Sequence, residues 1–252
     1  MMRWGLVTGA AGGIGEGIAR VLAADGWKVA VNDLDSARAE RVAKEIGGLA
    51  VPGDVGTENA EIIGAVVEAV QADSGQLGAL VNNAGMVRRQ ALDTVAADQL
   101  DLVYRVNLRA PILLSQAALP HLRVAGGSIV NISSIAALSP FMGGGLYSAS
   151  KAGLASFTQQ AAVEWGPSGV RVNAIAPGMI RSGLSEDIWQ DPELVEHRRR
   201  LVPLGRIGDP EDIGRVVSFL VSDAAAFVTG QLISVDGGFT QVLLDQMPHT
   251  PP

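Results

Sequence analysis

Short apolar runs that do not alternate with polar residues recur along the whole chain, and stretches of helical character separate them. The seven runs, each bordered by Gly, Asn or Asp, are WGLVTG, KVAVND, GLAVPGDV, ALVNNAG, GSIVNISS, VRVNAIAPG and QLISVDGG. Runs without alternation are typical of strands that a parallel sheet buries on both faces. Their alternation with helices predicts an α/β fold, a doubly wound parallel sheet of about seven strands with helices on both faces.

The stretches between these runs predict the helices. They are Ile14–Asp25, Ser36–Ile46, Ala60–Ser74, Ala97–Leu122, Ser148–Trp165 and Pro210–Ser222. No linker-like stretch and no repeat interrupts the pattern, so we expect one domain over residues 1–252. We expect the tail, residues 241–252, to be frayed or docked on a neighbouring subunit.

Composition argues against several classes of function. The net charge of −7 disfavours nucleic-acid binding, which needs basic patches. The absence of cysteine excludes disulfides, thiol catalysis and thiolate metal sites, and no cluster has metal-ligand spacing. The absence of cysteine also fits a reducing compartment. Because the N-terminus has no apolar signal core either, we expect a cytoplasmic protein. The uncharged run 124–150 is rich in Gly and Ser, which argues against a membrane helix.

The first strand–helix junction carries a glycine-rich turn, LVTGAAGGIGEGIARVL. It places Gly9, Gly13 and Gly15 where a pyrophosphate can approach the N–H groups of a helix N-terminus without obstruction by side chains. Glycines alone would also fit an ordinary turn. The strand before this turn and the helix after it favour a dinucleotide site.

An acid at the end of the second strand indicates which dinucleotide binds. Asp33 follows Gly15 by 18 residues, about where a carboxylate holds the ribose hydroxyls of adenosine. That carboxylate would repel the 2′-phosphate of NADP, and Gly12 offers no basic side chain to hold one. We therefore expect NAD rather than NADP. The alternative is that Asp33 is a simple loop carboxylate.

Two further strand ends place residues at the edge where open α/β sheets bind ligands. Asp54 could accept a hydrogen bond from the adenine amine and Val55 could flank its ring, unless Asp54 caps the next helix. The NNAG motif contains Asn83, Ala84 and Gly85 and suits a backbone turn near the ribose. As a bare tetrapeptide it indicates only a turn.

Tyr147 and Lys151 lie four positions apart at the start of a predicted helix, in a run of small neutral residues. They therefore share one helix face. Beside a lysine cation and an oxidised nicotinamide the phenolate is favoured, so we expect the pKa of Tyr147 to fall from about 10 toward working pH. Ser133 and Ser134 end the fifth strand, where a hydroxyl can hold a substrate carbonyl oxygen. The alternative is an ordinary Tyr and Lys on a helix face.

Asn107 is a polar residue in the mostly apolar helical stretch VYRVNLRAPILL. Asn is a poor former of helix interiors, so we expect it to have a task. It could hold a water that connects Lys151 to solvent. The alternative is a helix irregularity that the backbone satisfies.

Together these motifs resemble the short-chain dehydrogenase/reductases in their common form, which has about the length of this chain. The resemblance covers Leu6 to Phe239 and rests on TGAAGGIG, DV, NNAG, the Asn of VNL, the Ser of NISS, YSASK, PGMIRS and SVDGG. It implies a Rossmann-like fold with Tyr147 as acid/base. Lys151 would lower the pKa of Tyr147 and bind the nicotinamide ribose, and Asn107 would hold the relay water.

The same resemblance assigns further contacts. Ser134, thirteen positions before Tyr147, would position the substrate oxygen in preference to Ser133. The backbone of Ile180 and the hydroxyl of Ser182, where the family usually has Thr, would contact the nicotinamide carboxamide. The residues expected to bind the cofactor are Gly9, Gly13, Ile14, Gly15, Asp33, Asp54, Val55, Asn83, Ala84, Gly85, Tyr147, Lys151, Pro177, Ile180 and Ser182.

The resemblance also implies a homotetramer. It places the helices Ala97–Leu122 and Ser148–Trp165 at one interface and the run GQLISVDGG at another. Beyond a small-molecule substrate, the cofactor and its own copies, we expect no nucleic-acid or membrane partner.

The substrate is the least defined part of this prediction. The resemblance places it between the loop IAALSPFMGGGL after Ser134 and a segment of about residues 182–205. Arg198–Arg200 in that segment, together with Arg88 and Arg89 after NNAGM, could bind an anionic substrate through their guanidinium groups. Alternatively, the arginines form a solvated helix face that offsets nearby acids. These acids are Glu186, Asp187 and Glu193.

A preference for NAD favours oxidation of an alcohol over biosynthetic reduction. We therefore expect an NAD-dependent oxidoreductase that transfers a hydride between nicotinamide and a secondary alcohol of the cyclic alcohol, sugar or polyol type. One alternative is a 3-oxoacyl reductase that uses NADPH, against which Asp33 argues. Another is a non-catalytic NAD-binding scaffold or sensor, against which the complete set of Ser134, Tyr147 and Lys151 argues.

Overall fold

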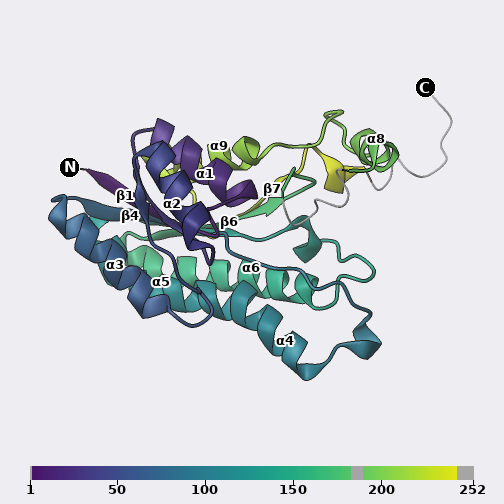
Figure 1. Cartoon of the computed structure of the whole chain (residues 1–252), viewed down its shortest axis with the longest axis horizontal. Helices are drawn as coiled ribbons and strands as arrows, with labels where there is room; N and C mark the ends of the chain where they lie inside the picture. The colour runs from purple at the N-terminus through teal and green to yellow at the C-terminus, as the bar shows by residue number, and fades with distance from the viewer. Residues whose placement is uncertain (1, 183–189, 243–252) are drawn as a thin grey trace.

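Seven parallel strands form one sheet in the computed structural model, which describes residues 2–182 and 190–242 (Figure 1). Their order across the sheet is β3-β2-β1-β4-β5-β6-β7. The strands are β1 (Arg3–Thr8), β2 (Lys28–Asn32), β3 (Leu49–Ala50), β4 (Gln76–Asn82), β5 (Ser128–Ile132), β6 (Arg171–Pro177) and β7 (Leu232–Val235). The chain starts in the middle of the sheet, builds outward to β3 and then returns to build the other half. This order confirms the predicted doubly wound fold.

Helices cover both faces of the sheet. They are α1 (Gly13–Ala24), α2 (Ser36–Ile46), α3 (Asn59–Ala72), α4 (Ala97–Tyr104), α5 (Ala110–Ala125), α6 (Tyr147–Trp165), α8 (Pro192–Arg200) and α9 (Pro210–Val221). On one face α1, α2 and α9 pack around buried residues such as Ile18 and Val217. On the other face α3, α5 and α6 pack around residues such as Val66 and Leu114 (Figure 1).

Neighbouring residues of β1 show why the strands lack alternation. Leu6 and Val7 are both 0% exposed. Leu6 belongs to the core beneath α3 and α5, whereas Val7 belongs to the core beneath α1 and α9. Because both faces are covered, consecutive positions must be apolar. The carboxyl ends of these parallel strands meet at one edge of the sheet, where the polar motifs of the sequence come together.

The helix expected over Ala97–Leu122 is the main departure from the prediction. It consists of α4, a π-helical turn at Arg105–Arg109 and α5, which runs on to Ala125. A π turn accommodates an extra residue and is frequent at functional sites. Asn107 lies within this turn.

Helix α8 lies in the segment that the sequence assigned to a substrate loop. Its start follows the usual rules, because Asp191 accepts hydrogen bonds from the backbone N–H groups of Glu193 and Leu194, and Pro192 occupies the first turn.

Residues 183–189, which include Glu186 and Asp187, and residues 243–252 of the tail lie outside the described residues. Within residues 2–182 and 190–242, no helix is long and apolar enough to cross a membrane.

Candidate active site

The structure brings Ser134, Tyr147 and Lys151 together at the carboxyl end of β5. Tyr147 is the first residue of α6, and its phenol lies near enough to the Ser134 hydroxyl for that hydroxyl to lower its pKa. The Nζ atom of Lys151 lies 5.9 Å from the centre of the Tyr147 ring. The spacing of four residues thus places the amine beside the aromatic ring on one helix face.

Lys151 is an amine in an almost fully buried position, 3% exposed. Its Nζ donates a hydrogen bond of 2.8 Å to the carbonyl oxygen of Ile132, the last residue of β5. Burial lowers the pKa of Lys151 to about 8, because a charged amine is costly to remove from water. Ser133 ties the same strand end to α6 by donating to the Lys151 carbonyl at 2.9 Å, so its hydroxyl has a structural partner.

Burial has the largest effect on the pKa of Tyr147 in the protein alone. Burial raises the pKa of the phenol, and the Ser134 hydroxyl offsets part of that rise. In the protein alone, desolvation therefore outweighs the effect of Ser134 on this pKa. The fall in the pKa of Tyr147 that is expected beside an oxidised nicotinamide stays a prediction.

Asn107 clamps two segments together from inside the π turn. Its side chain pairs with the Met86 peptide in both directions: Oδ1 accepts from the Met86 N–H at 2.8 Å and Nδ2 donates to the Met86 carbonyl at 2.8 Å. Nδ2 also lies 3.1 Å from the Ser150 hydroxyl. The side chain is fully buried and ties the end of NNAG to α6. The irregularity considered from the sequence is therefore present, and the Asn side chain uses it to reach Met86.

Gly85 leaves space between two of the expected catalytic residues. A Cβ atom at this position would lie 3.2 Å from Lys151 Nζ and 3.4 Å from Asn107 Oδ1. Only a residue without a side chain keeps that space open.

The glycine-rich turn can be built only from glycine at the expected positions. Gly9 and Gly13 have φ angles of +61° and +53°, which favour glycine. A Cβ on Gly15 would overlap the carbonyl oxygen of Gly9 and the side-chain nitrogen of Asn83. At Gly9, Gly13 and Gly15 the turn therefore carries no side chain of its own. This geometry fits a dinucleotide pyrophosphate.

The NNAG motif holds this turn from the neighbouring strand. Asn83 Nδ2 donates to the carbonyl oxygens of Thr8 and Gly9 at 2.9 and 3.0 Å. The Thr8 hydroxyl accepts from the backbone N–H groups of Asn83 and Ala84, each at 3.0 Å. The side chain of Asn83 is thus used to join β1 to β4. A contact with the cofactor would fall to the backbone of this motif.

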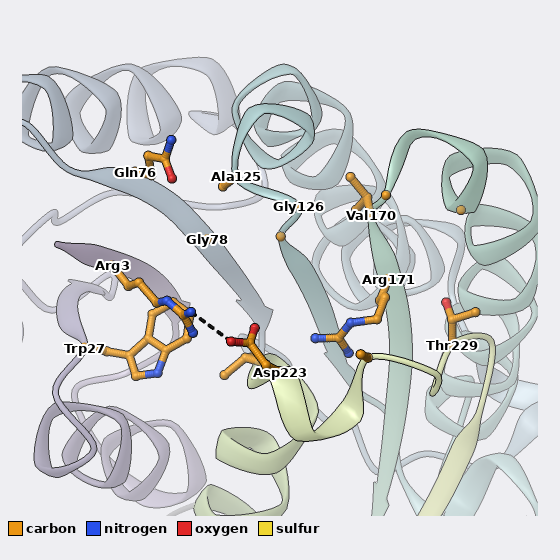
Figure 2. A pocket seen from close by; sticks show the side chains of 15 residues that line it. Arg3, Trp27, Gln76, Gly78, Ala125, Gly126, Val170, Arg171, Asp223 and Thr229 are labelled. Carbon is orange, nitrogen blue, oxygen red and sulfur yellow. Dashed lines mark hydrogen bonds and ion pairs between the residues drawn. The ribbon is translucent and has the colours of Figure 1, made fainter. Parts of the chain in front are cut away.

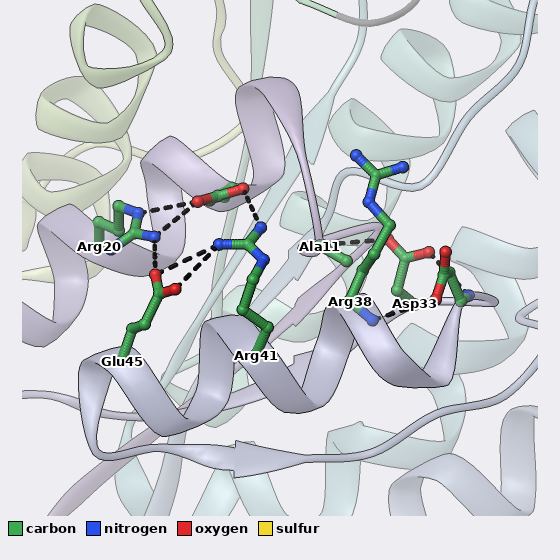
Figure 3. Close-up of polar contacts among 8 residues, drawn as sticks. Ala11, Arg20, Asp33, Arg38, Arg41 and Glu45 are labelled. Carbon is green, nitrogen blue, oxygen red and sulfur yellow. Dashed lines mark hydrogen bonds and ion pairs between the residues drawn. The ribbon is translucent and has the colours of Figure 1, made fainter.

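Asp33 lies beside the glycine-rich turn, at the end of β2 (Figure 3). Its Oδ2 accepts from the Ala11 N–H at 3.0 Å, and its Oδ1 accepts from the Asp35 N–H at 3.1 Å. The carboxylate is therefore fixed next to the turn, as its position in the sequence predicts.

Arg38 is a cation near this turn that the sequence reasoning missed. A Cβ on Gly12 would lie 3.1 Å from its guanidinium nitrogen. The neighbouring cations Arg20 and Arg41 share the carboxylates of Glu16 and Glu45 in an ion-pair network (Figure 3). Arg38 forms no such pair within the described residues. The sequence does not predict this position of Arg38, which belongs to the first turn of α2. Only folding brings its side chain back over the glycines.

Asp54 and Val55 have local structural contacts. Asp54 Oδ1 accepts from the Gly56 N–H at 2.7 Å and closes a tight turn. Helix α3 begins four residues after Val55 with Glu58 at its N-cap, so the Asp54 carboxylate is not a helix cap. Val55 is buried in the core beneath α3 and α5. Their contact with adenine stays a prediction.

The PGMIRS segment leaves β6 after Pro177 and is fixed by a backbone bridge. Ile180 pairs with Gly208, and the Arg181 N–H donates to the Gly208 carbonyl at 2.9 Å. Ser182, just beyond, and Gly13 of the glycine-rich turn line one cleft of about 660 Å³. The two segments expected to bind opposite ends of a dinucleotide thus border the same space.

A separate hollow of about 580 Å³ lies at the opposite edge of the sheet, where the strands begin (Figure 2). Its cations already have protein partners. Arg3 pairs with Asp223 at 3.1 Å, and Arg171 donates to the Leu220 carbonyl at 2.6 Å, near the end of α9. No predicted site residue lines this hollow. We therefore place the chemistry at the carboxyl edge.

Comparison with known proteins identifies relatives that match most of the chain. A family model described as Enoyl-(Acyl carrier protein) reductase matches residues 9–240. A 3-oxoacyl-[acyl-carrier-protein] reductase of Thermotoga maritima is 37% identical, over 92% of this chain and 96% of its own. A cis-4-hydroxycyclohexanecarboxylate dehydrogenase of Sinomonas cyclohexanicum is 39% identical, over 95% of this chain and 97% of its own.

Solved structures extend the likeness. A 3-ketoacyl-(acyl-carrier-protein) reductase from Brucella melitensis, complexed with NADH, has a TM-score of 0.84 and 34% identity, over 94% of this chain and 98% of its own. A gluconate 5-dehydrogenase from Burkholderia cenocepacia J2315, in complex with NADP and tartrate, has a TM-score of 0.84 and 31% identity, over 95% of each chain. The chain belongs to the short-chain dehydrogenase/reductase family, and it is an oxidoreductase that acts on alcohols or ketones with a nicotinamide cofactor.

Proposed function

We propose that this protein is an NAD-dependent dehydrogenase of secondary alcohols, of the cyclic alcohol, sugar or polyol type. The observation that carries the proposal is the position of the Tyr147 phenol beside the Ser134 hydroxyl and the buried amine of Lys151. A phenol flanked by a hydroxyl and an amine is an acid/base group aimed at one substrate oxygen.

Each residue of this set has one role in the reaction. In oxidation the Tyr147 phenolate takes the proton of the substrate hydroxyl, and in reduction the phenol returns it to the carbonyl oxygen. The Ser134 hydroxyl holds the same substrate oxygen, and the Lys151 cation stabilises the phenolate. When bound, nicotinamide accepts or returns the hydride. A water held near Asn107 would carry the proton from Lys151 to solvent.

Asp33 supports NAD as the cofactor. Its carboxylate is held next to the glycine-rich turn by the Ala11 N–H. A 2′-phosphate bound there would meet this negative charge, whereas ribose hydroxyls would donate to it. The relatives leave the choice open, because one was solved with NADH and another with NADP.

Arg38 favours a second candidate, a 3-oxoacyl reductase that uses NADPH. Its guanidinium lies over Gly12 and has no ion-pair partner within the described part of the chain. A guanidinium pairs strongly with phosphate. The 37% identical relative from Thermotoga maritima is a 3-oxoacyl-[acyl-carrier-protein] reductase.

The test is a spectrophotometric screen of the purified protein against secondary alcohols, sugars and sugar acids, with NAD and NADP in parallel. We expect turnover of one chemical group, with kcat/KM at least about tenfold higher for NAD, a difference of about 1.4 kcal/mol. Preference for NADPH with 3-oxoacyl substrates would support the second candidate. Binding of NAD without turnover in either direction would support the scaffold.

Tyr147→Phe tests the acid/base role, because it removes the phenol oxygen and keeps the ring. We expect turnover to fall by about 10²- to 10⁴-fold, while calorimetry shows unchanged binding of NAD. The matched control is Tyr104→Phe in α4, which should keep its activity. Comparable rates in the two variants would contradict the assignment.

A further inference from the structure

Two of the arginines that the sequence offered for an anionic substrate are already paired. Arg199 and Arg200 both bind the carboxylate of Glu196, with Nε–O distances of 2.7 and 2.9 Å. They belong to the solvated helix face that the sequence allowed as an alternative. The uncharged loop that leads into α6 is the better candidate for contact with the body of the substrate.

This loop, between β5 and α6, exposes apolar side chains close to the candidate active site. Leu138 is 51% exposed, Phe141 43% and Met142 100%. Single exposed apolar residues are ordinary on protein surfaces, but three within five positions call for an explanation. The stretch from Val124 to Ser150, in which they lie, has no charged side chain. The loop therefore offers a ligand apolar surface rather than charge.

Phe141 lies next to Tyr147. The centres of the two rings are 6.4 Å apart and their planes are tilted by 60°, which is ordinary geometry for an aromatic pair. The Nζ atom of Lys151 lies 5.9 Å from the centre of the same Tyr147 ring. The ring of the expected acid/base thus has one polar and one apolar neighbour.

Gly144 fixes the Phe141 ring in this place. A Cβ atom at this glycine would lie 2.9 Å from Cζ of the ring and 3.0 Å from Cε2, so the ring rests directly on the backbone of Gly144. The Gly144 carbonyl also accepts from the Tyr147 N–H at 3.2 Å. The same residue thus seats Phe141 and joins the start of α6, and a side chain there would displace the ring.

A second segment holds this loop. Gln90, which follows β4, forms a backbone bridge with Gly144. The Gln90 N–H donates to the Gly143 carbonyl at 3.0 Å, and the Gly145 N–H donates to the Gln90 carbonyl at 3.1 Å. The backbone beneath Phe141 is therefore anchored on both sides of Gly144, while nearly half of the Phe141 surface stays exposed.

We propose that Phe141 packs against the hydrocarbon body of the substrate, so that the alcohol oxidised is an alicyclic secondary alcohol and not a sugar or a polyol. This inference rests on the proposed function and narrows its substrate class. Contact between the exposed ring and CH₂ groups of the substrate removes apolar area of both from water, which favours binding.

A sugar or a polyol would place hydroxyl groups against this surface instead. Ser139 is the only hydroxyl, amide or charged side chain among residues 135–146, so the loop has little to offer them. A hydroxyl that loses its water without gaining a partner weakens binding. The loop therefore favours a substrate whose single hydroxyl lies toward Ser134 and Tyr147.

A series of six-membered rings that differ only in the number of hydroxyl groups tests this inference. The substrates are cyclohexanol, a cyclohexanediol and myo-inositol, each with NAD. Turnover should fall along the series, with kcat/KM at least about tenfold higher for cyclohexanol than for myo-inositol.

Phe141→Ala should raise the KM for cyclohexanol by about 10- to 100-fold and leave kcat within about threefold of the wild type. The reason is that contact with the ring body is the same before and during the hydride transfer. Phe141→Leu keeps an apolar side chain and should keep most of the affinity. Phe219→Ala in α9 is the matched control, because Phe219 is 44% exposed and lies outside this loop. It should keep the wild-type KM.

Binding is measured without turnover by calorimetry of cyclohexanol added to the protein with NADH. An alcohol and a reduced cofactor cannot exchange a hydride, so only binding contributes to the signal. In this complex Phe141→Ala should weaken the binding of cyclohexanol by about the factor by which it raises KM, and Phe219→Ala should leave it unchanged.

The outcomes separate this inference from the proposed function. A preference for myo-inositol, no binding of cyclohexanol, or equal binding in the wild type and Phe141→Ala would overturn it. An equal loss in Phe141→Ala and Phe141→Leu, seen in kcat and not in KM, would assign Phe141 to the support of Tyr147 and overturn it as well.

Two further results decide between other readings of the loop. Fewer chains per particle in Phe141→Ala by light scattering, with unchanged binding of cyclohexanol, would make the loop a contact between copies and overturn the inference. Cyclohexanol binding that depends on Phe141, without turnover of any alcohol, would support the apolar contact and contradict the dehydrogenase.

Discussion

At the scale of single residues, burial separates Tyr147 and Lys151 from an ordinary pair on a helix face. Their spacing predicted the shared face, and the structure places the amine beside the ring. Spacing carries no information on desolvation, however. Burial raises the pKa of Tyr147 and lowers that of Lys151 to about 8. Only the fold shows that in the protein alone both groups are driven toward their neutral forms.

The lowered pKa of Lys151 predicts a pH-dependent stability. Between about pH 8 and 10.5 the unfolded chain keeps the Lys151 proton that the folded chain has released, so the stability contributed by this residue rises with pH. Relative to Lys151→Met, the wild-type apoprotein should gain roughly 2 kcal/mol between pH 7.5 and 9.5. Urea unfolding of both proteins at equal concentration measures the difference. A difference that does not change with pH would show that burial leaves this pKa unshifted.

At the scale of elements, the sequence predicts helices better than it predicts their interruptions. The π turn between α4 and α5 depends on Asn107 reaching Met86, a contact across 21 positions that no local pattern contains. The packing of α1 on α9 also depends on a distant contact. A Cβ on Gly17 would overlap the Pro210 ring, and one on Gly214 would lie 3.0 Å from the Gly17 carbonyl oxygen.

This close approach predicts opposite effects for two glycine-to-alanine changes in helices. Gly17→Ala should lower the free energy of unfolding by about 1–3 kcal/mol, because its Cβ would also lie 2.8 Å from the Pro210 carbonyl carbon. Gly64→Ala in α3 should raise it by about 0.5–1 kcal/mol, because nothing lies within 4 Å and alanine restricts the unfolded chain. Urea unfolding of both variants measures these changes. The same sign for both would contradict the packing argument.

At the scale of the whole molecule, topology explains which predictions were reliable. Apolar runs without alternation identified all seven strands, because a sheet covered on both faces needs them. The strand ends then placed Ser134 at the ligand edge. Arg38 was beyond such reasoning, since the neighbours of its side chain are set by how α2 folds back over the sheet. Sequence patterns thus locate the ligand-binding edge of the sheet. Side chains that reach this edge from the helices can be located only in the structure.

The homotetramer implied by the family resemblance is a prediction at this same scale. Two apolar side chains lie on or beside segments assigned to its two interfaces: Val163 on α6 is 78% exposed, and Phe227 before GQLISVDGG is fully exposed. In a tetramer with two kinds of interface, Val163→Lys should open one and Phe227→Lys the other. Light scattering should then give four chains for the wild type, two for each variant and one for the double variant.

Leu34→Lys, at an exposed position after β2, should stay tetrameric. A monomeric wild type at working concentration would contradict this assembly, and unchanged tetramers in both variants would place the interfaces elsewhere.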